Sequence, residues 1–404
     1  MIGRSRWPAA ARPEMCNVPQ CRKLFLAFPR RTAVEDLARL DIKAIIDSMS
    51  DGVYVCDLDR KITYWSKSAE RITGWSAEDV VGTPCFDNVL CHVDKDGHLL
   101  CGEEYCPLHR SMITDTRSKG SLLVYAQAKD GQRVPTQVAV APIHNDAGEV
   151  IGGVETFRDA SEIVHDLERA KAIQGVALHH DLPEDARVAF TTHYIPQAIV
   201  GGDYYAIEKL GDDQYAIMLA DVMGHGIAAA LYTMHLSQLW QRYHKLLKAP
   251  VEFAAKVNNE LARVVKTDES FATAVCALVD LKDRTFRFAG AGGPQVVLMH
   301  ADGTCAYLES PGLPLAIMED APYEEVSVKI QAGDSLLLFS DGAIEIQNAD
   351  GKMLDVDGLV TILRKQGYPE RGIDMGALEE ELLKYSNAIR IEDDLTLIEV
   401  RFVK

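Results

Sequence analysis

The stretch of residues 199–231 constrains the fold of this chain more than any other. It contains two aspartates, Asp203 and Asp221, each at the end of an apolar run where a strand would turn. An aspartate in that position points its carboxylate out of the sheet edge instead of into the core. A glycine turn over 224–226 follows, and then an apolar, Ala-rich helix is expected over 226–247.

The glycine turn brings a strand end, a carboxylate and a helix N-terminus together. Gly224 and Gly226 allow close backbone approach and positive φ values. A helix N-terminus favours an anion such as phosphate. We therefore predict that Gly224 and Gly226 bind the substrate.

The same signature recurs further along the chain. Asp341 follows the expected strand 334–340, and the pair Asp393 and Asp394 precedes the expected strand 395–402. Any single aspartate of this kind is usually turn chemistry, but separated carboxylates at several strand ends predict one shared cation site. Hard oxygen ligands without paired His or Cys favour Mg²⁺ or Mn²⁺ over Zn²⁺.

Length and charge restrict the class of protein. A chain of 404 residues predicts two or three domains. The formal net charge of −18 argues against nucleic-acid binding and against an anionic membrane surface, and suits a protein that gathers cations. No apolar run of about 18 residues and no signal peptide occur, so we expect a soluble, cytoplasmic protein.

The N-terminal segment differs from the rest of the chain. Residues 1–31 hold seven Lys or Arg against the single acidic residue Glu14, and we expect residues 1–35 to be a basic, disordered tail. The chain has nine cysteines, an odd count without an export signal, which argues against a disulfide framework.

Residues 36–158 are predicted to form a small α/β sensor domain. Two short strands and a short amphipathic helix come first, and three strands joined by Asp-Gly and Asp-Ala-Gly turns come last. This order, and the sequence DGVYVCDLDRKITYWSKSAERITGWSAEDVVG, resembles a PAS domain. The resemblance implies a fold but no particular ligand.

A cysteine-rich insertion over 85–106 departs from a minimal PAS domain. Cys85, Cys91, Cys101 and Cys106 are interleaved with histidines, but no two of them form a C-x-x-C pair. The four thiols are candidates for zinc or an iron–sulfur cluster, or for a thiol redox sensor. The alternative is an insertion whose cysteines are simply reduced and partly buried.

An amphipathic connector helix is predicted over 159–180, because apolar residues recur there at spacings of three and four. Its apolar side could pair with a second chain in a short coiled coil, which would make the protein a homodimer. It could equally pack on its own catalytic domain.

Residues 181–404 form the second predicted domain. Strands are expected at 187–195, 203–209, 214–222, 271–281, 285–291, 295–300, 334–340 and 395–402, and helices at 226–247, 250–265 and 374–388. Several strands follow one another without a helix, which predicts an α+β fold with antiparallel sheet.

The blocks YAIMLADVMGHGIAAAL, GDSLLLFSDGAIEIQNADG and EDDLTLIEV, taken in order, resemble the PPM family of metal-dependent serine/threonine phosphatases. The resemblance is to the bacterial branch typified by SpoIIE and RsbU, and it covers residues 165–404. It implies an αββα sandwich with a binuclear Mn²⁺ or Mg²⁺ site at one end. The metal ligands it implies are Asp203, Asp221, Val222 through its carbonyl, Asp341 and Asp393, with Asp394 as the alternative if the register shifts by one.

By the family pattern, Asp221 would bridge both ions, and no covalent phosphoenzyme is needed. His225 could protonate the departing serine oxygen, although its spacing from Asp221 also fits a purely structural role in the turn. Gly293 and Ala316 depart from the residues usual in this branch, a His and a Gly, which puts substrate contacts in doubt but not the metal site.

The favoured hypothesis is a signal-regulated phosphatase. By resemblance its substrate is a phosphorylated anti-sigma factor antagonist, a STAS-domain protein. The alternatives are a non-catalytic module that only docks a phosphoprotein, and a redox or metal sensor on a phosphatase fold.

Overall fold

The computed structural model describes residues 42–102, 105–118, 120–178, 181–224, 226–264, 270–388 and 391–403. The predicted basic tail over 1–35 lies outside these residues. None of the helices in the described ranges is long and apolar enough to cross a bilayer.

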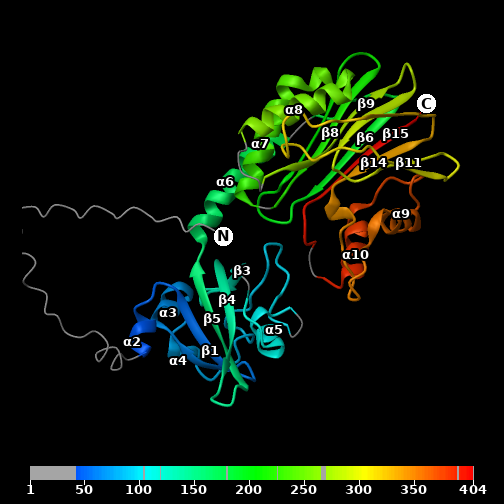
Figure 1. Cartoon of the computed structure of the whole chain (residues 1–404). Helices are drawn as coiled ribbons and strands as arrows, with labels where there is room; N and C mark the ends of the chain where they lie inside the picture. Colours follow the sequence, from blue (N-terminus) through cyan, green and yellow to red (C-terminus); the bar gives the residue numbers. More distant parts are fainter. Residues whose placement is uncertain are drawn as a thin grey trace, which may run out of the picture.

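The first domain is built on a five-stranded antiparallel sheet of order β2-β1-β5-β4-β3, the lower part of Figure 1. Its strands are β1 (Gly52–Asp57), β2 (Ile62–Trp65), β3 (Leu122–Gln127), β4 (Arg133–His144) and β5 (Val150–Asp159), and its helices are α2 (Ile42–Asp47), α3 (Lys67–Thr73), α4 (Ala77–Val80) and α5 (Pro107–Thr114). Tyr54, Trp65 and Phe157 contact one another in its core. The two early and three late strands expected from the sequence are therefore confirmed.

Helix α6 (Ser161–Leu178) leads from the first domain to the second. Gln174 and Leu178 are its buried residues, whereas Ile173 and Val176 are 61% and 78% exposed. The C-terminal end of this helix thus packs on the domain that follows, while other apolar side chains remain open to solvent.

The second domain contains two five-stranded antiparallel sheets, β13-β10-β9-β8-β7 and β12-β11-β14-β15-β6. The first sheet comprises β7 (Asp203–Lys209), β8 (Gln214–Val222), β9 (Ala272–Asp280), β10 (Thr285–Ala291) and β13 (Glu325–Lys329). The second comprises β6 (Val188–Ile195), β11 (Val296–Met299), β12 (Cys305–Leu308), β14 (Ser335–Phe339) and β15 (Leu395–Phe402).

The two sheets pack face to face around a shared apolar core that includes Ile217, Phe286 and Ile398. Helices α7 (Ile227–Tyr243) and α8 (Pro250–Val264), joined by η1 (His244–Lys248), cover the first sheet. Helices α9 (Asp355–Lys365) and α10 (Met375–Ser386) cover the second, on the opposite side in Figure 1. The α+β prediction with an αββα sandwich is confirmed.

Candidate metal centre

Two of the predicted acidic residues face each other across neighbouring strands. Asp203 begins β7 and is the direct cross-strand partner of Asp221 near the end of β8. Directly opposed residues project from the same face of a sheet, so the two carboxylates lie on one side. Val222, the next residue, donates its N–H to the Gly202 carbonyl at 3.1 Å, which holds the two strand ends together.

Asp203 is fully buried. Its Oδ2 accepts a hydrogen bond of 2.5 Å from the Thr396 hydroxyl on β15 of the other sheet, whereas its Oδ1 has no hydrogen-bond partner. Burial raises the pKa of Asp203 well above its usual range, and the nearby carboxylates of Asp394 and Asp341 raise it further. A buried carboxylate oxygen without a partner is costly unless a cation balances it.

Asp221 lies in the same acidic group. Burial raises its pKa to about 10, and repulsion from Asp203, Asp341 and Asp393 adds to the effect. Asp341 opens the short 3₁₀ helix η2 (Asp341–Ala343) directly after β14, and its Oδ1 is likewise buried without a hydrogen-bond partner. These oxygens fit hard divalent cations, because such ions prefer carboxylate ligands.

Asp393 and Asp394, which precede β15, lie in different surroundings. Asp394 is buried and accepts hydrogen bonds from two backbone amides, that of Gln197 at 2.6 Å and that of Gly202. It therefore secures the loop in front of Asp203. Asp393 is exposed and lies beside Gly342 and Glu345 in a small surface cavity, so the geometry favours Asp393 over Asp394 as the ligand.

Two hydroxyl residues of the centre, Ser340 and Thr396, were not predicted from the sequence. The Ser340 hydroxyl accepts a hydrogen bond from the Thr396 amide at 2.9 Å and donates to the Asp394 carbonyl at 3.2 Å. Ser340 precedes Asp341 and Thr396 lies two positions after Asp394, and this closeness to predicted ligands is the signal that could have identified them. Glu345 was also missed, and burial together with the charges of Asp341 and Asp393 raises its pKa.

The glycine turn has the backbone that its sequence predicts. Gly224 and Gly226 adopt φ values of 88° and 84°, which residues with a Cβ rarely adopt. Gly226 is the N-cap of α7. His225, the candidate proton donor, lies outside the described residues, and the predicted substrate contacts of the two glycines stay a prediction.

The two departures from the branch pattern lie in neighbouring loops. Ala316 adopts a φ of 71°, in the left-handed region that costs a residue with a Cβ about 1 kcal/mol. This explains why glycine is usual there. Gly293 lies against the backbone of Ala274, the nearest atom to an added Cβ being 3.4 Å away.

The four cysteines of the insertion over 85–106 do not form a compact metal cage in the described part of the chain. Cys85, Cys101 and Cys106 are buried, Cys91 is partly exposed, and the cysteines in the described part of the chain are all free thiols. Burial raises the pKa of Cys101 to about 12 and also raises those of Cys85 and Cys106, which makes these thiols poorly reactive. The prediction of zinc, an iron–sulfur cluster or a redox switch stays a prediction.

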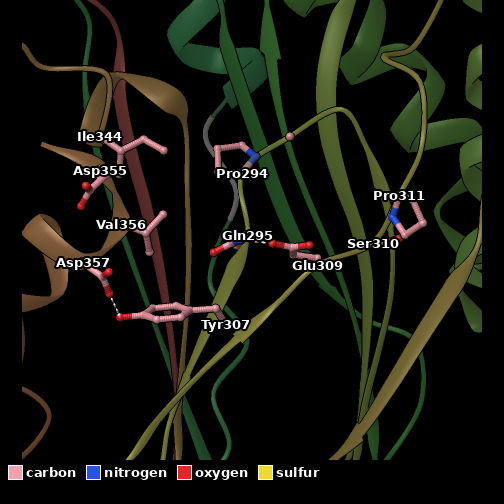
Figure 2. Close-up of a pocket in the computed structure, with 11 residues that line it drawn as sticks. Pro294, Gln295, Tyr307, Glu309, Ser310, Pro311, Ile344, Asp355, Val356 and Asp357 are labelled. Carbon is pink, nitrogen blue, oxygen red and sulfur yellow. Dashed lines mark hydrogen bonds between the residues drawn. The ribbon is translucent and has the colours of Figure 1, made fainter. Parts of the chain in front are cut away.

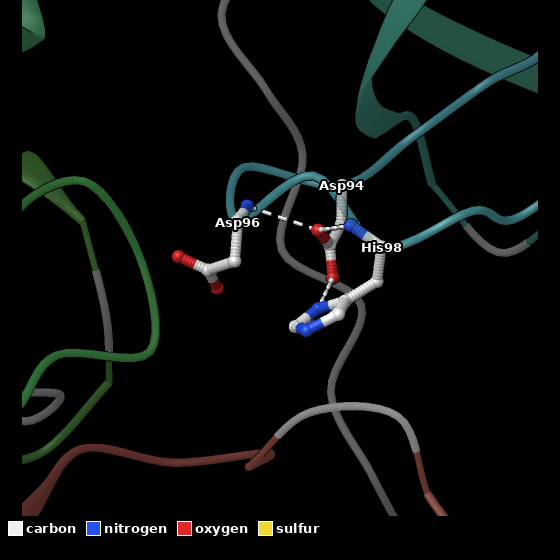
Figure 3. A group of neighbouring side chains, drawn as sticks. All are labelled: Asp94, Asp96 and His98. Carbon is white, nitrogen blue, oxygen red and sulfur yellow. Dashed lines mark hydrogen bonds and ion pairs between the residues drawn. The ribbon is translucent and has the colours of Figure 1, made fainter.

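A different group in the same domain is compact. Within the described ranges, Asp94, Asp96 and His98 are the only three His, Cys, Asp or Glu residues whose ligand atoms all lie within 4.8 Å of one another (Figure 3). Asp94 already accepts hydrogen bonds from the amides of Asp96 and His98, both at 2.9 Å, and contacts the His98 ring at 3.0 Å. These hydrogen bonds show that Asp94 stabilises the conformation of the loop over residues 94–98.

Comparisons with known proteins agree with this division into two domains. Residues 40–160 match the model of the PAS fold, and residues 211–403 match that of the stage II sporulation protein E family, SpoIIE. Phosphoserine phosphatase RsbP of Bacillus subtilis (strain 168) is 28% identical over 183 residues, which are 45% of this chain and 45% of that protein.

Phosphoserine phosphatase RsbU of the same organism is 28% identical over 244 residues, 59% of this chain and 71% of that protein. For RsbP, by contrast, the match spans less than half of that protein's length. Among solved structures, the SiaA-PP2C domain of Pseudomonas aeruginosa aligns with a TM-score of 0.51 at 22% identity, over 60% of this chain and 99% of that domain. This likeness shows the fold of the second domain.

Proposed function

We propose that this chain is a signal-regulated, metal-dependent protein serine/threonine phosphatase, because residues 40–160 match the PAS fold and residues 211–403 match the SpoIIE family. The observation that carries the proposal is the acidic group at one end of the sandwich. There Asp203 and Asp341 each keep a buried carboxylate oxygen without a hydrogen-bond partner, beside Asp221.

The ligands we propose for two Mn²⁺ or Mg²⁺ ions are Asp203, Asp221, the carbonyl of Val222, Asp341 and Asp393. Such a pair of ions supplies the charge that activates water and balances the phosphoryl oxygens.

The remaining residues position these groups. Thr396 fixes the orientation of Asp203 through its hydroxyl, and Asp394 holds the backbone at Gly202. Among the described residues beyond the turn, no atom lies within 4 Å of a Cβ added at Gly224 or Gly226, so these residues leave room for a phosphorylated side chain at the N-terminus of α7. We assign to His225 the donation of a proton to the departing serine oxygen.

We propose a phosphorylated anti-sigma factor antagonist of the STAS type as the substrate. The support is the similarity to RsbP and RsbU, both named as phosphoserine phosphatases. In this proposal the domain limits are 36–158 for the sensor, 159–180 for the connector and 181–404 for the phosphatase, and the connector carries the signal between them.

The proposal is tested with Asp221→Asn in the full-length chain. Phosphate release from a phosphoserine STAS-domain protein should require Mn²⁺, stop in EDTA, and fall at least about 100-fold in the variant. Asp350→Asn, which changes an exposed turn, serves as the control and should keep the parent rate. Equal rates for Asp221→Asn and the parent chain would show that the acidic group has no catalytic role.

A further inference from the structure

The second domain carries an open groove beside the segments that follow β10 and β14 (Figure 2). Gln295, Tyr307 and Glu309 line it from the β11–β12 side, and Ile344, Asp355 and Asp357 line it from the side of η2 and α9. We name it the acidic groove. Its volume is about 970 Å³, enough for several residues of an extended peptide.

Both walls of the acidic groove lead back to the proposed metal ligands. Ile344 donates its N–H to the Asp341 carbonyl at 2.8 Å, so this wall begins one turn from Asp341. On the other side, Gly293 lies against Ala274, and the strand that carries Ala274 pairs with the end of β8. A protein segment that reaches the metal centre can therefore continue into the groove.

The groove carries uncompensated negative charge. Glu309, Asp355 and Asp357 line it, and its described lining contains no Lys or Arg. The hydrogen bonds these carboxylates accept come from neutral groups. Gln295 donates to Glu309, the Tyr307 hydroxyl to Asp357 at 2.5 Å, and the Gly358 amide to Asp355 at 3.0 Å. Their charges are therefore available to a cationic ligand.

Apolar surface lies between these charges. Pro294, Pro311 and Val356 also line the groove, and the Tyr307 ring is partly exposed within it. Long Lys and Arg side chains suit such a surface, because their methylene stems pack on apolar groups while their charged ends reach carboxylates.

We propose that the acidic groove docks the segment of the phosphoprotein that flanks the phosphoserine, and that this segment carries Lys or Arg. The inference rests on the proposed phosphatase function and specifies its substrate class. The metal centre recognises the phosphate, and the groove selects for positive charge near it. Charge complementarity at an exposed rim acts mainly on association and on the choice between partners.

The test uses the full-length chain with Mn²⁺ and three substrates. Two are synthetic phosphoserine peptides, one with lysines on both sides of the phosphoserine and one with alanines in their place. The third is p-nitrophenyl phosphate, which is too small to reach the groove. The parent chain should show a higher kcat/KM for the lysine peptide than for the alanine peptide, and added salt should reduce this preference.

The variant combines Glu309→Gln with Asp357→Asn, which removes two charges and keeps acceptors for Gln295 and Tyr307. We expect kcat/KM for the lysine peptide to fall about threefold to tenfold, with no change for the other two substrates. The matched control is Glu370→Gln with Asp146→Asn, which removes two exposed charges outside the groove.

Equal kcat/KM for both peptides in the parent chain, or an unchanged lysine preference in the variant, would overturn the groove proposal. Hydrolysis of p-nitrophenyl phosphate would leave the phosphatase function standing in that case. If the parent chain hydrolyses the phosphoserine STAS-domain protein but neither peptide, the groove proposal alone fails; if it hydrolyses none of these substrates, the proposed function fails and the groove proposal fails with it.

Discussion

Glu155 lies on β5 inside the core of the PAS domain, with almost no solvent exposure. The Tyr54 hydroxyl donates to its Oε2 at 3.2 Å, and His92 Nε2 lies 3.6 Å from its Oε1. Burial raises the pKa of Glu155 to about 8 and lowers that of His92 to about 4. Both side chains are therefore neutral in the folded protein at pH 7.

This pKa predicts how pH affects the stability of the PAS domain. Between pH 4.5, the ordinary pKa, and pH 8, folded Glu155 holds a proton that the unfolded chain has lost. The stabilisation is complete below this window and is lost as pH rises through it, by at most about 1.4 kcal/mol per pH unit. Glu155→Gln cannot titrate, so calorimetric scans from pH 5.5 to 8 should show a smaller fall in its Tm. Parallel falls in the two proteins would refute this.

At the scale of elements, Gln174 connects α6 to the metal centre. Its Nε2 donates to the Gly201 carbonyl at 2.7 Å and to the Thr233 hydroxyl of α7 at 2.9 Å, and its Oε1 accepts from the Gly201 amide at 3.3 Å. Gly201 must be glycine here, because an added Cβ would lie 1.9 Å from the Tyr194 hydroxyl. One buried side chain thus fixes the loop that leads into Asp203.

Gln174→Ala would leave the buried amide and carbonyl of Gly201 unpaired, at a cost of about 1–3 kcal/mol per group. We expect the loop before Asp203 to loosen, so that half-maximal phosphatase activity requires at least about threefold more Mn²⁺. Metal titrations of activity check this, with Glu168→Ala on the exposed side of α6 as the control. An unchanged titration curve would mean that α6 does not support the centre.

Mostly buried strands were predictable from the sequence, even short ones such as β11 and β14, and exposed or irregular elements were not. Strands β7, β8 and β9 match their predicted ranges closely, because their apolar runs are long. Helix α9 was missed because Gly358 and several β-branched residues interrupt its helical pattern. Strands β12 and β13 were missed because they are short and their side chains are partly or fully exposed, whereas the equally short β11 and β14 are buried throughout.

The sequence likewise reveals only part of the acidic centre. The aspartates were predictable because each adjoins an apolar run. The supporting role of Asp394 and the contact of Thr396 with Asp203 were not, since their partners lie 192 and 193 residues away in the chain. Contacts of that kind arise from the packing of two sheets and leave no local pattern.

At the scale of the whole molecule, α6 presents an unpartnered apolar side. Ile173 and Val176 are exposed on it, whereas Gln174 and Leu178, on the other side of the helix, pack on the second domain. Both sequence hypotheses for the connector can therefore hold at once, one for each side of the helix. We propose a homodimer in which the exposed side chains of two α6 helices meet.

The change Ile173→Glu with Val176→Glu should convert this dimer into a monomer at micromolar concentration, because it would bury charge in the helix pair. Light scattering measures the mass, and Lys171→Glu, also exposed on α6, is the control. A parent chain of monomeric mass would contradict the dimer, and a dimeric double variant would place the interface elsewhere.

The proposed ligands belong to both sheets of the sandwich. Asp203 and Asp221 come from the β7–β8 edge of one sheet, and Asp341 follows β14 of the other. An ion bound by carboxylates from both sheets would link the two layers of the sandwich reversibly. Binding that occurs only in the folded state adds about 2.7 kcal/mol to the free energy of unfolding at a hundredfold excess over the dissociation constant. The supply of divalent metal would then set how long the catalytic domain survives in the cell, as well as how fast it works.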